Sequence, residues 1–225
     1  MGQKIHPKGL RLGPLFTWSA RWFARGDAQY RRLLFEDVKI RDFLHKKLKA
    51  AGMDQVEIER SINKMKITLH VSRPGMVIGR GGTGLEDLKK GIERFLLEHK
   101  KNEQKILRVT SGKETGKLKV EIAVEPVKEP NLSAFLIATT IADQLARRFP
   151  HRRACNHAVE RVMSAGARGV KILLAGRIAG AEISRREKFS AGTVPLSTIR
   201  ENVDFASVPS LTKSGYIGVK VWICR

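Results

Sequence analysis

The chain has 225 residues and two cysteines, and its 43 Lys and Arg residues against 22 Asp and Glu residues give a formal net charge of +21. Its apolar fraction of 42% excludes a wholly disordered chain, and no stretch approaches the run of about 20 apolar residues that spans a membrane. The charge exceeds the magnitude of about 2–8 that solubility requires, so it indicates a polyanionic partner, with nucleic acid favoured over a membrane surface.

The N-terminal residues 1–26 mix Pro, Gly and basic residues with scattered aromatic side chains and lack a sustained helix or strand period. We expect an extended basic arm that orders against a partner, with Lys4, Lys8 and Arg11 contacting RNA. The segment also lacks the apolar core and the cleavage site of a secretory signal. The default location is therefore the cytoplasm.

Hydrophobic periodicity predicts a helix, two strands, a glycine loop and a second helix in the first half of the chain. The expected elements are a helix over 27–51, strands over 56–59 and 66–71, a single helical turn near 76–79, a helix from Leu85, and strands over 106–110 and 118–124 around a turn at 111–116.

Residues 125–130, with two prolines, are typical of a linker. Beyond it we expect two helices and a three-stranded sheet. The expected elements are a helix capped by Asn131 or Ser133 and ended by Pro150, a helix over 152–165, strands over 169–178, 181–189 and 215–224, and a short helical turn over 197–204.

The glycine loop fits two phosphate-binding patterns. Gly79, Gly81 and Gly84 spell the dinucleotide-binding G-x-G-x-x-G, but Pro74 and Gly75 separate them from the preceding strand and no parallel βαβ pattern continues. The stretch from Gly79 to Gly82 also spells G-x-x-G, the backbone clamp of KH modules.

We favour the clamp, since it needs only small residues that let the backbone approach sugar-phosphate units. Arg80 adds a cation inside the loop, and the next helix offers its positive N-terminus. Gly79, Arg80, Gly81 and Gly82 are therefore predicted to contact RNA, with a plain glycine turn as the alternative. A Walker-like stretch, Gly112 to Leu118, is one residue short and has Leu118 where Ser or Thr would bind magnesium.

Basic side chains cluster twice in the second half. Arg147, Arg148, Arg152 and Arg153 straddle Pro150, where their mutual repulsion favours a bound anion such as an RNA backbone, with a solvated helix end as the alternative. Arg177, Arg185, Arg186 and Lys188 form a second set, for which phosphate contact and salt bridges to Glu182 and Glu187 are both open.

No group of residues predicts catalysis. Cys155 and Cys224 form no Cys-x-x-Cys pair, and the six histidines complete no metal-ligand spacing. No Ser/His/Asp or Cys/His set has local support. We therefore expect no enzyme, no cofactor and no small-molecule substrate, with a nucleotide-dependent enzyme using the glycine loop as the rival from another class.

Four stretches together resemble the bacterial small-subunit ribosomal protein S-three family (universal uS-three): MGQKIHPKGLRLG at 1–13, SRPGMVIGRGG at 72–82, GRIAGAEISRREKF followed by VPL at 176–196, and GVKVWI at 218–223. The resemblance implies an α+β fold with a type II KH domain followed by a second α/β domain, two helices on a small mostly antiparallel sheet. The implied division is an arm over 1–26, the KH domain over 27–125, a linker over 126–130 and the second domain over 131–225.

The resemblance also implies a structural subunit that binds small-subunit rRNA in the head, beside ribosomal proteins S-ten and S-fourteen, and lines the mRNA entrance pore. Arg152 and Arg153 match the family's basic patch at that pore, whereas Asn156 is neutral at its third position. Gly81 likewise replaces a residue that is often basic, and the segment over 103–117 is longer than usual. A free-standing KH regulator or ribosome assembly factor is the alternative, and it does not account for the arm and the arginine-rich second domain in one chain.

Overall fold

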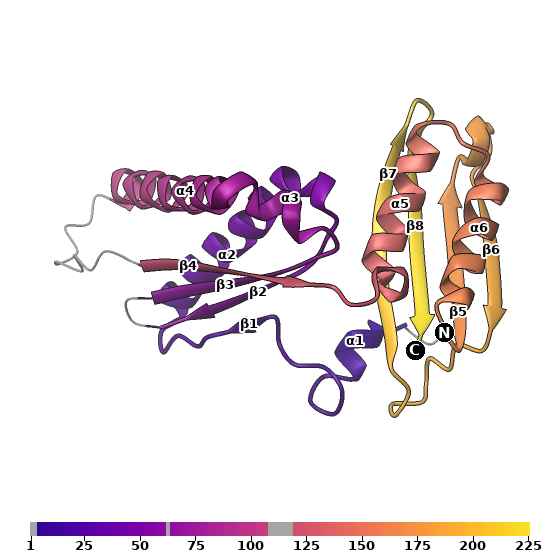
Figure 1. Cartoon of the computed structure of the whole chain (residues 1–225), viewed down its shortest axis with the longest axis horizontal. Coiled ribbons are helices and arrows are strands. Elements are labelled where there is room, and N and C mark those ends of the chain that lie inside the picture. Colours follow the sequence, from indigo (N-terminus) through magenta and orange to yellow (C-terminus); the bar gives the residue numbers. More distant parts are fainter. Residues whose placement is uncertain (1–3, 62–63, 108–118) are drawn as a thin grey trace. The chain divides into compact units, whose positions relative to one another are not determined.

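The computed structural model describes residues 4–61, 64–107 and 119–225 (Figure 1). Internal contacts divide the chain into two compact units. The first unit is Trp18–Lys128, and the second combines Met1–Thr17 with Glu129–Arg225. Among the helices of the described residues, none is both long enough and apolar enough to cross a membrane.

The first unit has the α–β–β–α–α–β order of a type II KH domain. Its elements are α2 (Asp27–Lys47), β2 (Met53–Arg60), β3 (Lys64–Val71), α3 (Pro74–Ile78), α4 (Thr83–Leu107) and β4 (Lys119–Pro126), with a two-residue strand β1 (Ala20–Arg21) beside β2. The sheet order is β1-β2-β3-β4, in which β2 and β3 are antiparallel and β3 and β4 are parallel. The helices α3 and α4 make the crossover that a parallel strand pair requires.

Helices α2 and α4 supply the core of this unit. Ile40 and Leu44 of α2, Ile67 of β3, and Leu88 and Ile92 of α4 are almost completely buried in one cluster. The three- and four-residue spacing within each helix sets these side chains on one face, which packs on the sheet. Both predicted helices are therefore confirmed. Helix α4 extends to Leu107, into the range where a strand was expected.

A buried ionic cluster ties the segment before α2 to the sheet. The Arg60 guanidinium of β2 donates to Asp37 Oδ1 (Nε, 2.9 Å) and to Glu36 Oε2 (Nη1, 2.8 Å), and Trp22 Nε1 donates to Asp37 Oδ2 at 2.6 Å. All three charged side chains are less than a tenth exposed. The pairing satisfies two carboxylates that could not otherwise be buried.

The second unit is a four-stranded antiparallel sheet with two helices on one face. Its elements are α5 (Ala134–Ala146), α6 (His151–Ser164), β5 (Gly169–Gly176), β6 (Arg185–Gly192), β7 (Val203–Thr212) and β8 (Gly215–Cys224), in the sheet order β6-β5-β8-β7. Ser133 Oγ accepts from Leu136 N at 3.3 Å, so Ser133, one of the two predicted candidates, caps α5. The core lies between helices and sheet, around residues such as Ile141, Val162, Ile172 and Val219.

Two predictions in this unit are wrong. The sheet has four strands, because β7 was missed. No helix forms over 197–204, where Glu201 N donates to Thr198 O at 3.4 Å in a single turn and Val203 and Asp204 already belong to β7. Ser207 and Pro209 weaken the strand pattern of β7, whose pairing with β8 holds it in place. The strand expected over 181–189 also begins later, at Arg185.

One prediction in the first unit is wrong as well. Ile106 and Leu107, expected in a strand, are the last residues of helix α4. Residues 108–110 and the predicted turn over 111–116 lie outside the described residues.

The described part of the N-terminal segment is ordered against the protein itself, contrary to the expectation of an extended arm. Helix α1 (Pro7–Leu10) leads to Arg11, which is 0% exposed. The Arg11 guanidinium donates to five backbone carbonyls: Pro7 O (3.0 Å), Pro195 O (3.2 Å), Leu196 O (3.1 Å), Thr198 O (2.9 Å) and Glu201 O (2.7 Å). A planar fork with several donors suits such a cluster of acceptors, so Arg11 fastens the segment to the loop between β6 and β7.

Candidate nucleic-acid interface

The glycine loop joins α3 to α4 and has the geometry of a backbone clamp. Gly79 (φ +72°), Gly81 (φ +63°) and Gly82 (φ +81°) all adopt positive φ, which residues with a Cβ rarely do. A Cβ added at Gly84 would lie 2.5 Å from Val77 O, so a glycine is required where α4 leaves the loop. Arg80 is exposed at the tip of the turn, beside the positive N-terminus of α4.

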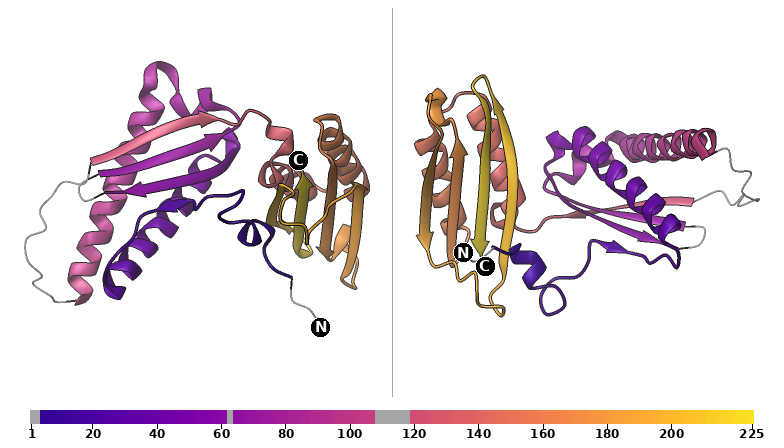
Figure 2. Two further views of the ribbon diagram at one scale, coloured as in Figure 1. Left: turned by 90° about the horizontal axis from the view of Figure 1, so that it is seen from below. Right: turned by 180° about the vertical axis from the view of Figure 1, so that it is seen from behind.

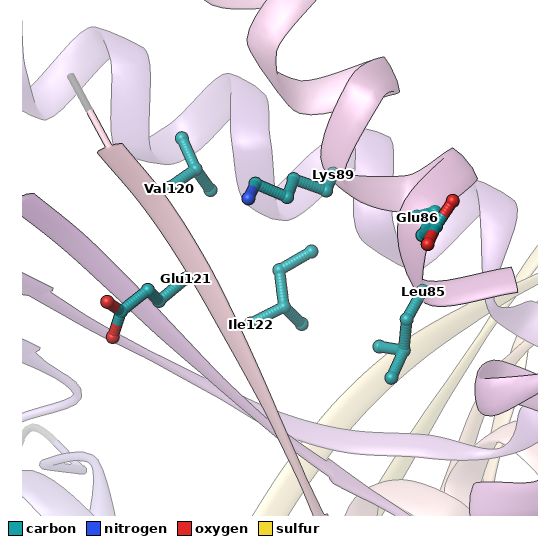
Figure 3. A pocket seen from close by; sticks show the side chains of 6 residues that line it. All are labelled: Leu85, Glu86, Lys89, Val120, Glu121 and Ile122. Carbon is teal, nitrogen blue, oxygen red and sulfur yellow. The ribbon is translucent and has the colours of Figure 1, made fainter. Parts of the chain in front are cut away.

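A hollow of about 350 Å³ lies beside the loop, between the first turns of α4 and strand β4 (Figure 3). Val120 and Ile122 of β4 and Leu85 of α4 supply its apolar lining, and Lys89 reaches into it from the helix. Glu121 points to the other side of the strand, where Lys64 Nζ lies 2.7 Å from its carboxylate and lowers its pKa by hydrogen bonding. The hollow thus has an apolar floor, and Lys89 and the two carboxylates Glu86 and Glu121 are also among its lining residues.

The joint between α5 and α6, which we define as Arg147, Arg148, Arg152 and Arg153, is exposed at all four arginines. Arg148 adopts φ +60°, an uncommon conformation for a residue with a Cβ, and Arg153 lies over the Phe149 ring at 5.9 Å. His151, Arg152 and Arg153 form the first turn of α6, which contains no acidic residue. Cations here oppose the helix dipole, so the arrangement favours an anion held between helix N-terminus and side chains.

Glu187 of β6 holds this joint to the sheet. Its carboxylate contacts His151 Nε2 at 2.9 Å and accepts a hydrogen bond from Arg185 Nε at 2.8 Å. Burial tends to raise the pKa of Glu187, but His151 and Arg185 outweigh it and lower that pKa below its usual value. Glu187 therefore remains ionised and fixes the start of α6, which supports charge pairing over acid–base chemistry for this residue.

Within the described residues, the other predicted contact residues divide into exposed cations and cations that have a partner in the protein. Lys4, Arg186 and Lys188 are exposed, whereas Lys8 Nζ pairs with Asp204 Oδ1 at 2.8 Å and Arg185 pairs with Glu187. Arg177 is exposed, but its Nε donates to Ala181 O at 2.8 Å and holds the turn Ile178–Gly180. Arg11 is the clear correction, because a buried guanidinium with five carbonyl partners cannot reach a phosphate.

Sequence reasoning missed two cations of the second sheet. Lys171 and Lys220 share a face with Arg186 and Lys188, as the strand register shows. The sequence signal was the alternation in β8, where Val219 and Val221 are buried and Lys220 between them is exposed. That alternation indicates that Lys220 points away from the core. Among the described residues, no group of three or more His, Cys, Asp or Glu side chains could hold a metal ion.

Comparison with known proteins covers both units. A KH domain family model matches residues 39–132, and the model of the ribosomal protein S3 C-terminal domain matches residues 141–223. The chain is 44% identical over all its 225 residues to "Small ribosomal subunit protein uS3" of Carboxydothermus hydrogenoformans, covering 92% of that protein. It is 45% identical over its whole length to the protein of the same name from Desulforudis audaxviator, covering 94% of it.

Proposed function

This chain belongs to the small ribosomal subunit protein uS3 family, a structural and non-enzymatic family, and from that premise we propose how it contacts RNA. It binds small-subunit rRNA in the head of the particle and offers the arginine joint to mRNA at the entrance pore. The family location is the small ribosomal subunit of the cytoplasm. Ribosomal proteins S-ten and S-fourteen are the neighbours that the family resemblance implies.

The observation that carries the proposal is the start of α6. Arg152 and Arg153 occupy a helix turn where the dipole disfavours cations, and Glu187 holds that turn in place through His151. Such an arrangement costs stability in the free protein and is relieved by a phosphate. The glycine loop and its hollow form a second proposed contact, with Gly79, Arg80, Gly81 and Gly82 along the backbone of a single strand.

The same premise supports a division into a KH domain over 27–125 and a second domain over 131–225, joined by 126–130. The order of the two family models, over 39–132 and 141–223, supports this division, and the boundary between the two units, after Lys128, falls inside the proposed linker. The N-terminal residues through Thr17 are then part of the second domain, because Arg11 binds its carbonyls.

The arginine joint is tested with the double variant Arg152→Ala plus Arg153→Ala. The affinity of the full chain for single-stranded RNA is measured against salt concentration, and the log–log slope should fall by about 0.7 for each lost phosphate contact. Arg31→Ala plus Arg32→Ala is the matched control, since these adjacent arginines are exposed on α2. Equal slopes in the two double variants would place the joint away from RNA.

The clamp is tested with Gly82→Asp. A Cβ at this position meets no atom within 4 Å, so the fold should tolerate the change at the cost of left-handed backbone strain of about 1 kcal/mol. The added carboxylate should repel phosphate and weaken single-strand binding. Unchanged affinity in a folded variant would remove the clamp assignment.

The free-standing regulator remains the alternative. Sedimentation of native lysate distinguishes the two functions, since a ribosomal subunit protein follows small particles in constant stoichiometry, whereas a regulator remains largely at the top of the gradient.

A further inference from the structure

The second sheet has a face that α5 and α6 leave uncovered (Figure 2, right). Residues directly opposite each other in antiparallel strands share a face, so the register defines this surface row by row. We call it the open sheet face. Its rows are Ser190, Lys171, Trp222 and Phe205; then Lys188, Leu173, Lys220 and Ser207; then Arg186, Ala175, Gly218 and Pro209; and last Tyr216 with Leu211.

The open sheet face carries cations and no acid. Lys171, Arg186, Lys188 and Lys220 lie on it. Across β5–β8, all of which the structure describes, the acidic residues are Glu187 and Asp204. Both lie on the other face, where Glu187 contacts His151 of α6 and Asp204 Oδ2 accepts from Ala134 N of α5 at 2.8 Å. The two sides of one sheet are thus sharply divided by charge.

These cations act on one another. Burial lowers the pKa of Lys171, and the charges of Lys188 and Lys4 lower it further. Lys4 of the N-terminal segment therefore adds to the positive potential at the open sheet face. Like charges gathered on one side of a sheet repel each other unless an anion lies among them.

The shape of the face leaves its middle accessible. At one end the face is closed, since Lys171 Nζ lies 5.4 Å from the centre of the Trp222 ring and His6 packs edge-on against Phe205 at 4.9 Å. In the second row Lys188 and Lys220 flank Leu173 and are two strands, about 10 Å, apart. In the third row the small residues Ala175 and Gly218 lie between Arg186 and Pro209. At the far end Tyr216 is 68% exposed and Leu211 is 62% exposed.

We propose that the open sheet face binds a single-stranded segment of RNA, with Arg186, Lys188 and Lys220 contacting phosphates and a base stacked on Tyr216. Exposed aromatic rings beside a cationic track are the usual means of holding unpaired bases. The methyl group of Ala175 and the bare backbone of Gly218 let ribose approach the sheet. An acidic protein segment would satisfy the cations but gives no account of the exposed ring.

This surface is separate from the glycine loop and from the arginine joint, and it rests on the proposed function. It is tested with the full chain and a fluorescein-labelled oligouridylate of about 15 nucleotides, whose affinity is followed by anisotropy between about 0.05 and about 0.5 M KCl. The variant is Lys188→Ala plus Lys220→Ala. The matched control is Lys46→Ala plus Lys128→Ala, two exposed lysines of the other unit.

If both lysines contact phosphate, the log–log salt slope should fall by about 1.4, which weakens binding by about 25-fold at 0.1 M salt and has little effect near 1 M. Ultraviolet crosslinking should attach the oligonucleotide to the peptide that contains Tyr216, and Tyr216→Leu should abolish that adduct. Circular dichroism melting curves of all variants should match the parent, because the altered side chains are exposed.

A slope equal to that of the control pair would overturn the proposal. So would tight binding of oligoglutamate that the same lysine pair abolishes, because the face would then take an acidic protein segment. Failure of the proposed function looks different: the unaltered chain would neither bind RNA nor enter small subunits. Failure of this inference alone leaves binding by the parent chain and the effect of Arg152→Ala plus Arg153→Ala intact.

Discussion

Replacing Arg11 with alanine should open one specific part of the second unit. The side chain donates to five carbonyls, four of them in the loop over 195–201, and is 0% exposed. Net hydrogen bonds to a charged group contribute about 1.5–3 kcal/mol each, and truncating a buried charged partner typically costs about 3–5 kcal/mol in total, because water reaches some of the freed carbonyls. We take about 4 kcal/mol as the expected loss.

Hydrogen exchange followed by mass spectrometry measures this loss where it occurs. A change of about 4 kcal/mol raises the equilibrium constant for local opening about a thousandfold. Amides over 7–16 and 193–202 should therefore exchange about a thousandfold faster, or at the rate of an unprotected amide. Amides in the first unit should exchange as before. Arg11→Lys should recover only part of the protection, since an ammonium cannot reproduce the planar fork of donors.

Arg168→Ala is the control for this experiment. Arg168 is exposed and pairs with the Glu201 side chain in the same loop, and an exposed pair contributes about 0–1 kcal/mol. If Arg11→Ala altered exchange no more than Arg168→Ala did, the burial and bonding of Arg11 would not hold the N-terminal segment, and our account of that segment would be wrong.

Three further predictions concern stability. Arg60→Ala leaves two buried carboxylates unpaired and should destabilise the first unit by about 3–5 kcal/mol in calorimetry, without moving the transition of the second unit. Gly84→Ala places a Cβ 2.5 Å from Val77 O and should destabilise the same unit more than Gly81→Ala, whose Cβ meets no atom within 4 Å; equal melting temperatures would contradict this. Burial raises the pKa of Cys155 to about 12 from 9.0. As pH rises above about 9, Cys155 therefore ionises in the unfolded state but stays protonated in the folded state. Its contribution to the free energy of unfolding is complete below that pH and is lost as pH rises toward 12. Chemical denaturation at pH values between about 8 and about 11 should show that the free energy of unfolding falls more steeply with pH for the parent than for Cys155→Ala.

The sequence determined most of the secondary structure and the form of the glycine loop. Apolar residues at three- and four-residue steps predicted α2, α4, α5 and α6, since each helix must bury one face. The glycine loop was predicted from its own residues because positive φ at Gly79, Gly81 and Gly82 is a local requirement. Ser133 was predicted, with Asn131 as the other candidate, for the same reason, since a cap bonds within its own turn.

Only the tertiary structure decided which cations are exposed and which are buried. Arg11 has the same basic neighbours as Lys4 and Lys8, and its burial depends on carbonyls 184–190 residues away in the chain. The open sheet face likewise arises from register: Lys188 and Lys220 share it because both pair with Leu173. Periodicity reports the face of a single element, whereas pairing between distant strands is set by packing of the whole unit, and a side chain's partners follow from that packing.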